Sequence, residues 1–191
     1  MIVLRDLTKA YDGRMVIERF SAELQEGGKY LITAPSGAGK TTLLRLILGL
    51  EKPDAGEVAF RGQEPRFGVC FQEDRLFPSF SAVQNVVSVH SFLKGADGEA
   101  RARSMLAEIL PAEELGKPVS ELSGGMKRRV SLVRAMMSDG NVLVLDEPFT
   151  GLDDETRRRA IHFLEKHRGD RTLILTSHVT DGLSDFEIIS L

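Results

Sequence analysis

A short glycine-rich segment between two apolar runs constrains this chain most strongly. Residues 34–42, Ala-Pro-Ser-Gly-Ala-Gly-Lys-Thr-Thr, follow the apolar run 30–33 and precede a second apolar run at 43–48. This order predicts a strand, a tight turn and the start of a helix. The backbone amides of such a turn and of a helix start bind phosphate groups. We therefore predict that Lys40 contacts the β- and γ-phosphates of a nucleotide and that Thr41 contacts a magnesium ion.

The segment departs at one position from the G-x-x-x-x-G-K-T pattern typical of this chemistry, because Ala34 replaces the first glycine. Ala34 tolerates ordinary strand dihedrals, whereas a left-handed backbone would penalise its Cβ. Taken alone, the segment leaves a plain strand-to-helix connection open as the alternative. The residues predicted to bind the nucleotide here are Ser36, Gly37, Ala38, Gly39, Lys40, Thr41 and Thr42.

Composition limits the classes of protein to consider. The chain has 191 residues, of which 42% are hydrophobic, and this suits one packed domain or one domain with a small subdomain. No apolar run approaches the roughly 18 residues that span a bilayer, and the N-terminus shows no signal-peptide pattern. The net charge of −3 argues against a general polyanion binder, so we expect no nucleic-acid partner. We interpret the basic clusters 127–129 and 157–159 as solvated helix faces.

Apolar runs alternate with helical patterns along most of the chain. We expect the first strands to form an antiparallel edge sheet and the later, continuously apolar ones to form a parallel sheet covered by helices. Helical spacing predicts a helical insert over 81–115 and a crossover helix over 156–168. Cys70, the only cysteine, excludes an internal disulfide, and we interpret it as a packing residue. The expected strands are 2–4, 16–24, 29–33, 57–61, 67–71, 141–146, 171–176 and 186–191.

Two adjacent carboxylates end the apolar strand at 142–145. Asp146 and Glu147 fall at the edge where nucleotide sites lie in open α/β sheets. One carboxylate can hold Mg²⁺ through a water while its neighbour polarises the attacking water. We therefore predict Asp146 as a metal residue and Glu147 as a catalytic residue. A strand that merely ends in charged residues is the alternative.

A second glycine-containing helix start lies 23 residues before Asp146. The sequence Leu-Ser-Gly-Gly-Met at 122–126 places Ser123, Gly124 and Gly125 where they form another anion site. At this point the chain resembles the ATP-binding-cassette (ABC) ATPases, whose signature L-S-G-G-Q lies just upstream of the strand with paired carboxylates. A methionine replaces the glutamine here, and the serine and both glycines remain.

The resemblance covers nearly the whole chain and implies its fold. It implies an α/β protein with a P-loop NTPase core, a mostly parallel sheet, an N-terminal antiparallel β subdomain and a helical signature subdomain. We accordingly expect a single ABC ATPase domain over 1–191, with the helical subdomain at about 81–137 inserted in the core.

The resemblance also implies roles for four further positions. Tyr11 is similar to the aromatic residue that stacks on adenine, although an ordinary core tyrosine is the alternative. Gln72 resembles the glutamine that touches Mg²⁺ and senses the partner subunit. The segment 150–153 is similar to the loop that contacts the opposite subunit. His178 resembles the histidine that contacts the γ-phosphate, and we place it with Glu147 among the catalytic residues.

The activity that the resemblance implies is ATP hydrolysis, with ATP and Mg²⁺ as cofactors. It implies a head-to-tail homodimer or heterodimer in which Ser123 completes the site of the facing subunit. It further implies a membrane-spanning permease subunit, a solute-binding protein in the case of an importer, and a cytoplasmic location on the inner face of the membrane.

The segment 72–80 is apolar and aromatic and suits a groove for a partner helix. It resembles the corresponding stretch of bacterial import cassettes. Packing of Leu76 and Phe77 on the helical insert is the alternative. Two other functions stay open: a soluble ABC ATPase acting on DNA or ribosomes, and a nucleotide-binding regulator without catalysis, suggested by Ala34 and Met126.

Overall fold

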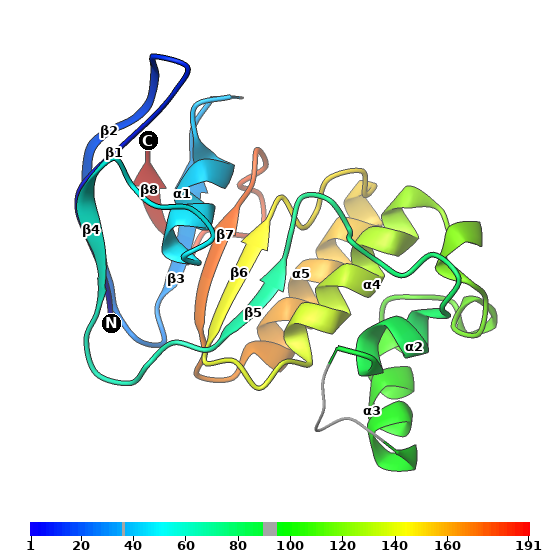
Figure 1. Ribbon diagram of the computed structural model, residues 1–191. Coiled ribbons are helices and arrows are strands. Elements are labelled where there is room, and N and C mark those ends of the chain that lie inside the picture. Colours follow the sequence, from blue (N-terminus) through cyan, green and yellow to red (C-terminus); the bar gives the residue numbers. More distant parts are fainter. Residues whose placement is uncertain (36, 90–94) are drawn as a thin grey trace. The chain divides into compact units, whose positions relative to one another are not determined.

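The computed structural model divides the chain into two compact units, and each is described by itself. Their elements are labelled in Figure 1. One of the divisions between the units falls between the two carboxylates Asp146 and Glu147. The prediction of one domain with an inserted helical subdomain stays a prediction. The structure describes residues 1–35, 37–89 and 95–191. Unit 1 is Met1–Phe67, Gly140–Asp146 and Asp170–Leu191, and unit 2 is Gly68–Asp139 and Glu147–Gly169.

Unit 1 consists of strands and the helix that follows the phosphate loop. Its described elements are β1 (Ile2–Tyr11), β2 (Arg14–Leu24), β3 (Lys29–Thr33), α1 (Lys40–Ile47), β4 (Ala55–Phe60), β6 (Val142–Asp146), β7 (Thr172–Thr176) and β8 (Glu187–Ser190).

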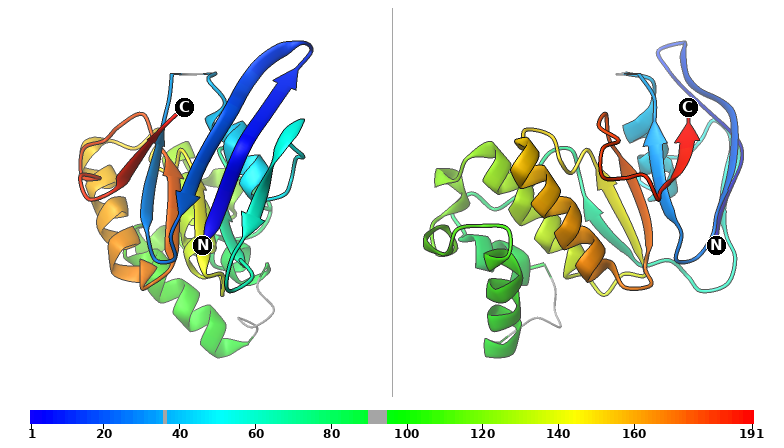
Figure 2. Two further views of the ribbon diagram at one scale, coloured as in Figure 1. Left: turned by 90° about the vertical axis from the view of Figure 1, so that its left-hand side faces the viewer. Right: turned by 180° about the vertical axis from the view of Figure 1, so that it is seen from behind.

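The predicted antiparallel sheet near the N-terminus is confirmed and has the order β2-β1-β4. The β1–β2 hairpin is seen along its length in Figure 2. The expected strand 2–4 was too short, because register shifts beyond Leu4 break the alternation that a regular strand shows. Asp6 at a φ of 45° lies within this irregular stretch. On β4, a Cβ at Gly56 would lie 2.3 Å from the Arg5 carbonyl oxygen, so this close approach requires glycine.

The predicted parallel sheet is also confirmed. In unit 1, neighbouring parallel strands follow the order β6-β7-β3-β8. Every residue of β6 and β7 is buried, which explains their continuous apolar character. Asp146 pairs with Thr176, and Thr176 pairs with Ile32. The carboxyl ends of three strands therefore meet at the edge where the phosphate loop leaves β3.

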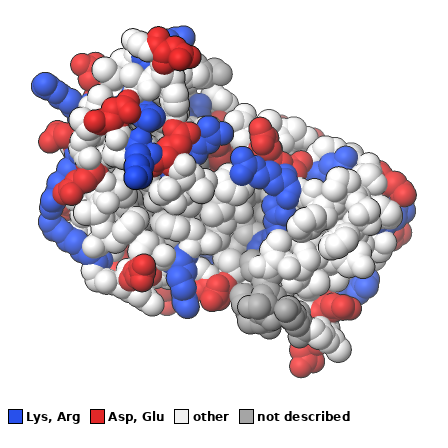
Figure 3. All heavy atoms as spheres, viewed as in Figure 1, with Lys and Arg blue, Asp and Glu red and all other residues white. Residues whose placement is uncertain are grey.

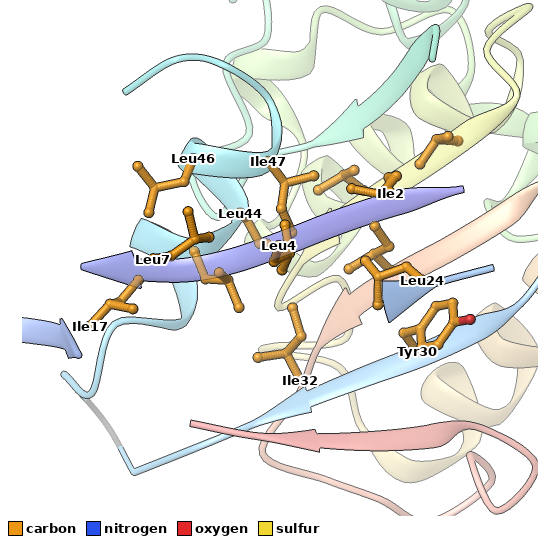
Figure 4. Packing of buried hydrophobic residues seen from close by; sticks show 14 residues of the cluster. Ile2, Leu4, Leu7, Ile17, Leu24, Tyr30, Ile32, Leu44, Leu46 and Ile47 are labelled. Atoms are coloured by element: carbon orange, nitrogen blue, oxygen red, sulfur yellow. The ribbon is translucent and has the colours of Figure 1, made fainter. Parts of the chain in front are cut away.

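Helix α1 is held by the hydrophobic core of unit 1, which Figure 4 shows. Its apolar positions recur at helical spacing and pack among side chains of both sheets. Burying each such side chain contributes about 1.5–3 kcal/mol. This packing fixes the axis of α1 and hence the start of the helix at the phosphate loop. The buried cluster is Ile2, Leu4, Leu7, Ile17, Leu24, Tyr30, Ile32, Leu43, Leu44, Leu46, Ile47, Val142, Val144 and Ile174.

Unit 2 is mainly helical, and helices are present within the stretch 81–115 for which helical spacing was predicted, over the residues that the structure describes. Helices α4 and α5 lie side by side in it (Figures 1 and 2). Residues 90–94 of the expected insert lie outside the described residues. The elements are β5 (Phe67–Cys70), which begins at the last residue of unit 1, then α2 (Ala82–Val87), α3 (Ala96–Ala107), the 3-10 turns Ala112–Glu114 and Val119–Glu121, α4 (Gly124–Met136) and α5 (Asp154–Arg168).

Two sequence-based interpretations have different outcomes in unit 2. Cys70 is a packing residue as expected: it is fully buried, and burial raises the pKa of its thiol. The interpretation of 127–129 as a solvated face was wrong for Arg128, which is 8% exposed. Its guanidinium donates to main-chain carbonyls that a sequence pattern cannot show. None of the helices in the described ranges combines the length and the apolar character needed to cross a membrane.

Candidate active site

The phosphate loop ends in a glycine that its surroundings require. Gly39 is the N-cap of α1 and has a left-handed φ of 99°. A Cβ at Gly39 would lie 2.8 Å from Val16 Cγ1 and 3.1 Å from the Val16 carbonyl oxygen. Because glycine carries no side chain, the first amides of α1 stay accessible to an anion.

Ala34, which replaces the first glycine of the G-x-x-x-x-G-K-T pattern, adopts no unusual backbone conformation. The non-glycine residues with positive φ in the described chain do not include Ala34. Its carbonyl oxygen accepts a hydrogen bond of 3.0 Å from Lys40 Nζ. The substitution therefore leaves the backbone of the loop unstrained.

Lys40 and His178 come together in unit 1 although they are far apart in the sequence. Lys40 Nζ lies 3.3 Å from His178 Nε2. Lys40 begins α1, whereas His178 follows β7 by two residues. The parallel pairing of β3 with β7 brings their carboxyl ends to the same edge and so makes this contact possible.

Asp146 accepts a hydroxyl hydrogen bond on each of its carboxylate oxygens. Thr41 Oγ1 donates to Oδ2 at 2.7 Å, and Thr176 Oγ1 donates to Oδ1 at 2.7 Å. Asp146 is 5% exposed, so these contacts stabilise a buried carboxylate. Sequence reasoning missed Thr176, and its position at the end of β7 was the only available signal.

A hydroxyl and a carboxylate oxygen next to a phosphate loop suit Mg²⁺, which prefers oxygen ligands and usually takes only one or two from the protein. Within the described ranges, no group of three or more His, Cys, Asp or Glu side chains is placed to hold a metal. The donor set of Thr41 and Asp146 therefore fits a magnesium ion that also contacts a bound nucleotide.

Tyr11 lies on the surface of unit 1. Its side chain is 39% exposed, so an ordinary core tyrosine does not describe it. The hydroxyl donates to Glu51 Oε2, and Arg45 Nη1 lies 3.2 Å from the other Glu51 oxygen. Partial burial and the bond to Glu51 raise the pKa of Tyr11. Glu51 and Arg45 orient the ring, and no sequence pattern indicated either of them.

In unit 2, the signature segment begins helix α4. Ser123 is the N-cap, and its Oγ accepts a hydrogen bond of 3.3 Å from the Met126 amide. Gly124 and Gly125 form the first helical positions. A Cβ at Gly125 would lie 3.2 Å from Leu152 Cδ2 and 3.4 Å from the Gly151 carbonyl oxygen. The signature therefore adjoins the loop 150–153, for which the resemblance implies a contact with another subunit.

Glu147 has a backbone conformation that is costly for a residue with a side chain. Its φ is 50°, in the left-handed region, and it is 8% exposed. The Thr150 amide donates to its carbonyl oxygen at 3.2 Å, and Thr150 Oγ1 donates to its Oε2 at 3.4 Å. Strained backbone of this kind is frequent at functional sites.

The predicted site residues are thus divided between the units. Ser36 lies outside the described residues. The members in unit 1 are Tyr11, Gly37, Ala38, Gly39, Lys40, Thr41, Thr42, Asp146 and His178. The members in unit 2 are Gln72, Ser123, Gly124, Gly125 and Glu147.

A glycine-rich loop between β3 and α1, followed by a lysine and a threonine that face a strand-end carboxylate, defines a P-loop type of nucleotide site. The chain belongs to the ABC transporter family, whose family model matches residues 17–150.

Curated relatives include both export and import proteins. The chain is 38% identical over 192 residues to the Nod factor export ATP-binding protein I of Burkholderia orbicola (strain AU 1054), covering 93% of this chain and 62% of that one. It is 35% identical over 199 residues to the sulfate/thiosulfate import ATP-binding protein CysA of Caulobacter vibrioides (strain ATCC 19089 / CIP 103742 / CB 15), covering 95% and 59% respectively. The chain therefore spans about 60% of the length of these relatives.

Solved structures share the fold over the whole chain. A dimeric bacterial ABC transporter cassette matches with a TM-score of 0.89 at 27% identity, covering 100% of this chain and 94% of the other. A dimeric ATP-binding cassette in a post-hydrolysis state with ADP and Pi matches with a TM-score of 0.87 at 26% identity and the same coverage. The expected P-loop NTPase fold is thereby confirmed.

Proposed function

We propose that this protein is the ATP-binding and ATP-hydrolysing subunit of an ABC transporter and powers solute transport through a separate membrane subunit. The observation that carries the proposal is the convergence of Lys40, Thr41, Asp146 and His178 at one edge of the parallel sheet. The export and import names of the relatives favour transport over action on DNA or ribosomes. On the face drawn in Figure 3, basic and acidic side chains are interspersed, which also suits a protein without a nucleic-acid partner.

Unit 1 supplies the residues for nucleotide binding. The loop amides at 37–42 and Lys40 bind the phosphates, and the ring of Tyr11 stacks on the base. Thr41 and Asp146 hold Mg²⁺, which neutralises phosphate charge when bound. His178 contacts the γ-phosphate from the end of β7.

Unit 2 supplies the residues for hydrolysis and for closure of the dimer. Glu147 accepts a proton from the attacking water. Gln72 contacts the metal ion that accompanies the nucleotide and thereby senses whether the nucleotide is bound. Ser123, Gly124 and Gly125 complete the site of the facing subunit in a head-to-tail pair. The close approach of Leu152 to the backbone of Gly125 supports this role, because two segments that the resemblance implies face the other subunit lie together.

Binding and hydrolysis then drive a cycle. Donors from the second subunit contact the γ-phosphate only in the closed pair, so ATP favours closure. Loss of the γ-phosphate removes these contacts, and the pair opens. A permease attached to both subunits would convert this movement into transport from the cytoplasmic side of the membrane.

We expect ATP turnover per subunit to rise with protein concentration, because two subunits are needed to complete each site. The measurement is phosphate release with Mg²⁺ and ATP over a wide range of protein concentrations. Turnover per subunit that is constant down to concentrations at which the protein sediments as a monomer would contradict the paired site.

The permease contact is proposed for the surface patch formed by Phe77 and Phe80. These side chains are 47% and 39% exposed, and their ring centroids lie 5.2 Å apart. Asn85 is fully buried and fixes the loop: it accepts from the Phe77 amide at 2.7 Å and donates to the Phe77 and Phe80 carbonyls. The patch is therefore preformed and open to an apolar helix end of the membrane subunit.

Replacing Phe77 by serine should weaken membrane attachment at least about fivefold, because exposed aromatic anchors contribute much of the binding energy of an interface. ATP turnover of the isolated protein should stay unchanged. The measurement is cosedimentation with inverted membrane vesicles from cells that express the transporter. Phe60→Ser is the matched control, because Phe60 is 44% exposed and lies in unit 1. Equal attachment of the two variants would contradict the assignment.

A further inference from the structure

Helix α4 holds the segment that contains Gln72 through one row of polar side chains. Arg128, Ser131 and Arg134 are spaced three residues apart and therefore lie along one face of the helix. All three donate to main-chain carbonyls of residues 71–75. The row thus ties the segment to a rigid element instead of leaving it a free loop.

Arg128 makes the contacts closest to Gln72. Its Nη1 donates to the Phe71 carbonyl oxygen at 2.6 Å, and its Nη2 donates to the carbonyl oxygen of Gln72 itself. The same guanidinium lies 3.3 Å from Asp74 Oδ1. Only the planar fork of arginine can contact two successive carbonyls and a carboxylate together.

The contacts between Arg128, Asp74 and the carbonyl oxygens of Phe71 and Gln72 are partly buried. Arg128 is 8% exposed, and Oδ1 of Asp74 is a buried atom. Burial raises the pKa of Asp74, and the nearby Arg128 opposes that rise. A buried cation is costly unless it is paired and hydrogen-bonded, so the contacts of Arg128 are difficult to exchange for others. The main chain of Gln72 is anchored while its side chain is exposed.

We propose that Arg128 is a positioning residue that couples Gln72 to the signature. Helix α4 begins at the signature serine and, little more than one turn later, anchors the Gln72 carbonyl through Arg128. A displacement of Gln72 on nucleotide binding is therefore transmitted to Ser123 and Gly125 through a rigid helix. The inference rests on the proposed function and deepens it, because it names the residue that links nucleotide sensing to dimer closure.

Glu147→Gln protein serves as the background in which closure is measured without hydrolysis. Adding Arg128→Gln or Arg128→Lys should weaken MgATP-dependent dimerisation at least about tenfold, because misplacing a group by about 1 Å is enough to cost this much. Binding of a fluorescent ATP analogue to the diluted monomer should change less than about threefold, since unit 1 is untouched. In the protein with Glu147 intact, kcat should fall at least about tenfold with little change in KM.

Two further variants separate coupling from a structural effect. Asp74→Asn keeps both arginine–carbonyl contacts, so dimerisation should stay within about threefold of the parent. Arg159→Lys is the control for an arginine substitution in unit 2, because its side chain is 71% exposed. Amide hydrogen exchange supplies the second measurement. With Arg128→Lys, ATP should still protect 37–42 but no longer protect 122–126, whereas general destabilisation would raise exchange throughout unit 2.

The outcomes distinguish failure of the coupling role of Arg128 from failure of the proposed function. Undiminished dimerisation and turnover with both Arg128 variants would overturn the coupling role and leave the proposed function intact. A loss with Asp74→Asn as large as that with Arg128→Lys would also overturn it, because the ion pair would then carry the effect. Failure of Glu147→Gln to dimerise, together with no turnover by the parent protein, would overturn the proposed function itself.

Discussion

Glu147→Gln protein is expected to bind ATP, to lose turnover by about 10²–10⁴-fold and to accumulate as a dimer with saturating MgATP. An amide cannot accept the proton of the attacking water, whereas its size and shape preserve the binding of the nucleotide. The closed state then persists because the γ-phosphate remains. Phosphate release and sedimentation velocity with and without MgATP measure the two effects.

Glu113→Gln provides a matched control, because Glu113 is an exposed residue of unit 2. The substitution removes one negative charge, as Glu147→Gln does, but removes it from the surface. This variant should hydrolyse ATP as the parent does and show no trapped dimer. A Glu147→Gln protein that stays monomeric with saturating MgATP, or that retains turnover, would remove the basis for the catalytic role of Glu147.

Gly39→Ala is expected to destabilise the protein by about 2–4 kcal/mol, a large effect for a single methyl group. The left-handed φ of 99° penalises any Cβ, by about 1–2 kcal/mol. The new Cβ would also meet the Val16 side chain at 2.8 Å and the Val16 carbonyl oxygen at 3.1 Å. Either the loop or β2 must move, and we therefore expect ATP affinity to fall at least about 100-fold, the loss that a 1 Å displacement of a site can cause. Urea unfolding without nucleotide and ATP titration measure these changes.

Gly37→Ala separates the backbone strain from the steric contact with Val16, the two contributions to the loss of stability expected for Gly39→Ala. Gly37 also has a left-handed φ, of 77°, but among the residues that the structure describes, its chain neighbours aside, no heavy atom lies within 4 Å of the position of its Cβ. The loss of stability in Gly37→Ala should therefore come only from backbone strain and amount to about 1–2 kcal/mol. Adding Val16→Ala to Gly39→Ala should recover part of the difference, since one of the two contacts is relieved. Equal losses for the two glycine variants would show that the contact with Val16 contributes nothing.

The local motifs were predictable because their chemistry depends on residues close in sequence. Strand β3 begins and ends where its apolar run predicts, at Lys29 and Thr33. The start of α1 at Lys40 and of α4 after Ser123 followed from glycine and capping patterns. The continuous apolar runs of β6 and β7 predicted a parallel sheet, which the pairing of these strands confirms.

Other features depend on contacts between distant segments, and the sequence pattern did not indicate them. The full length of β1 was hidden by its irregular register with β2. Glu51 reaches Tyr11 across 40 residues, and Thr176 reaches Asp146 across 30. Arg128 was interpreted as part of a solvated helix face because the basic cluster 127–129 lies in a helical context.

The sequence alone therefore determined the phosphate loop, the signature and the paired carboxylates, since amide, hydroxyl and carboxylate chemistry follows from residue type and short spacing. Only the tertiary structure decided which partner each side chain meets. It joined Lys40 to His178, gave Asp146 its two hydroxyl donors and buried Arg128 against the Gln72 carbonyl. The physical reason is that a periodic pattern specifies which face of an element is buried, whereas hydrogen-bond partners depend on the register and packing of elements far apart in the chain.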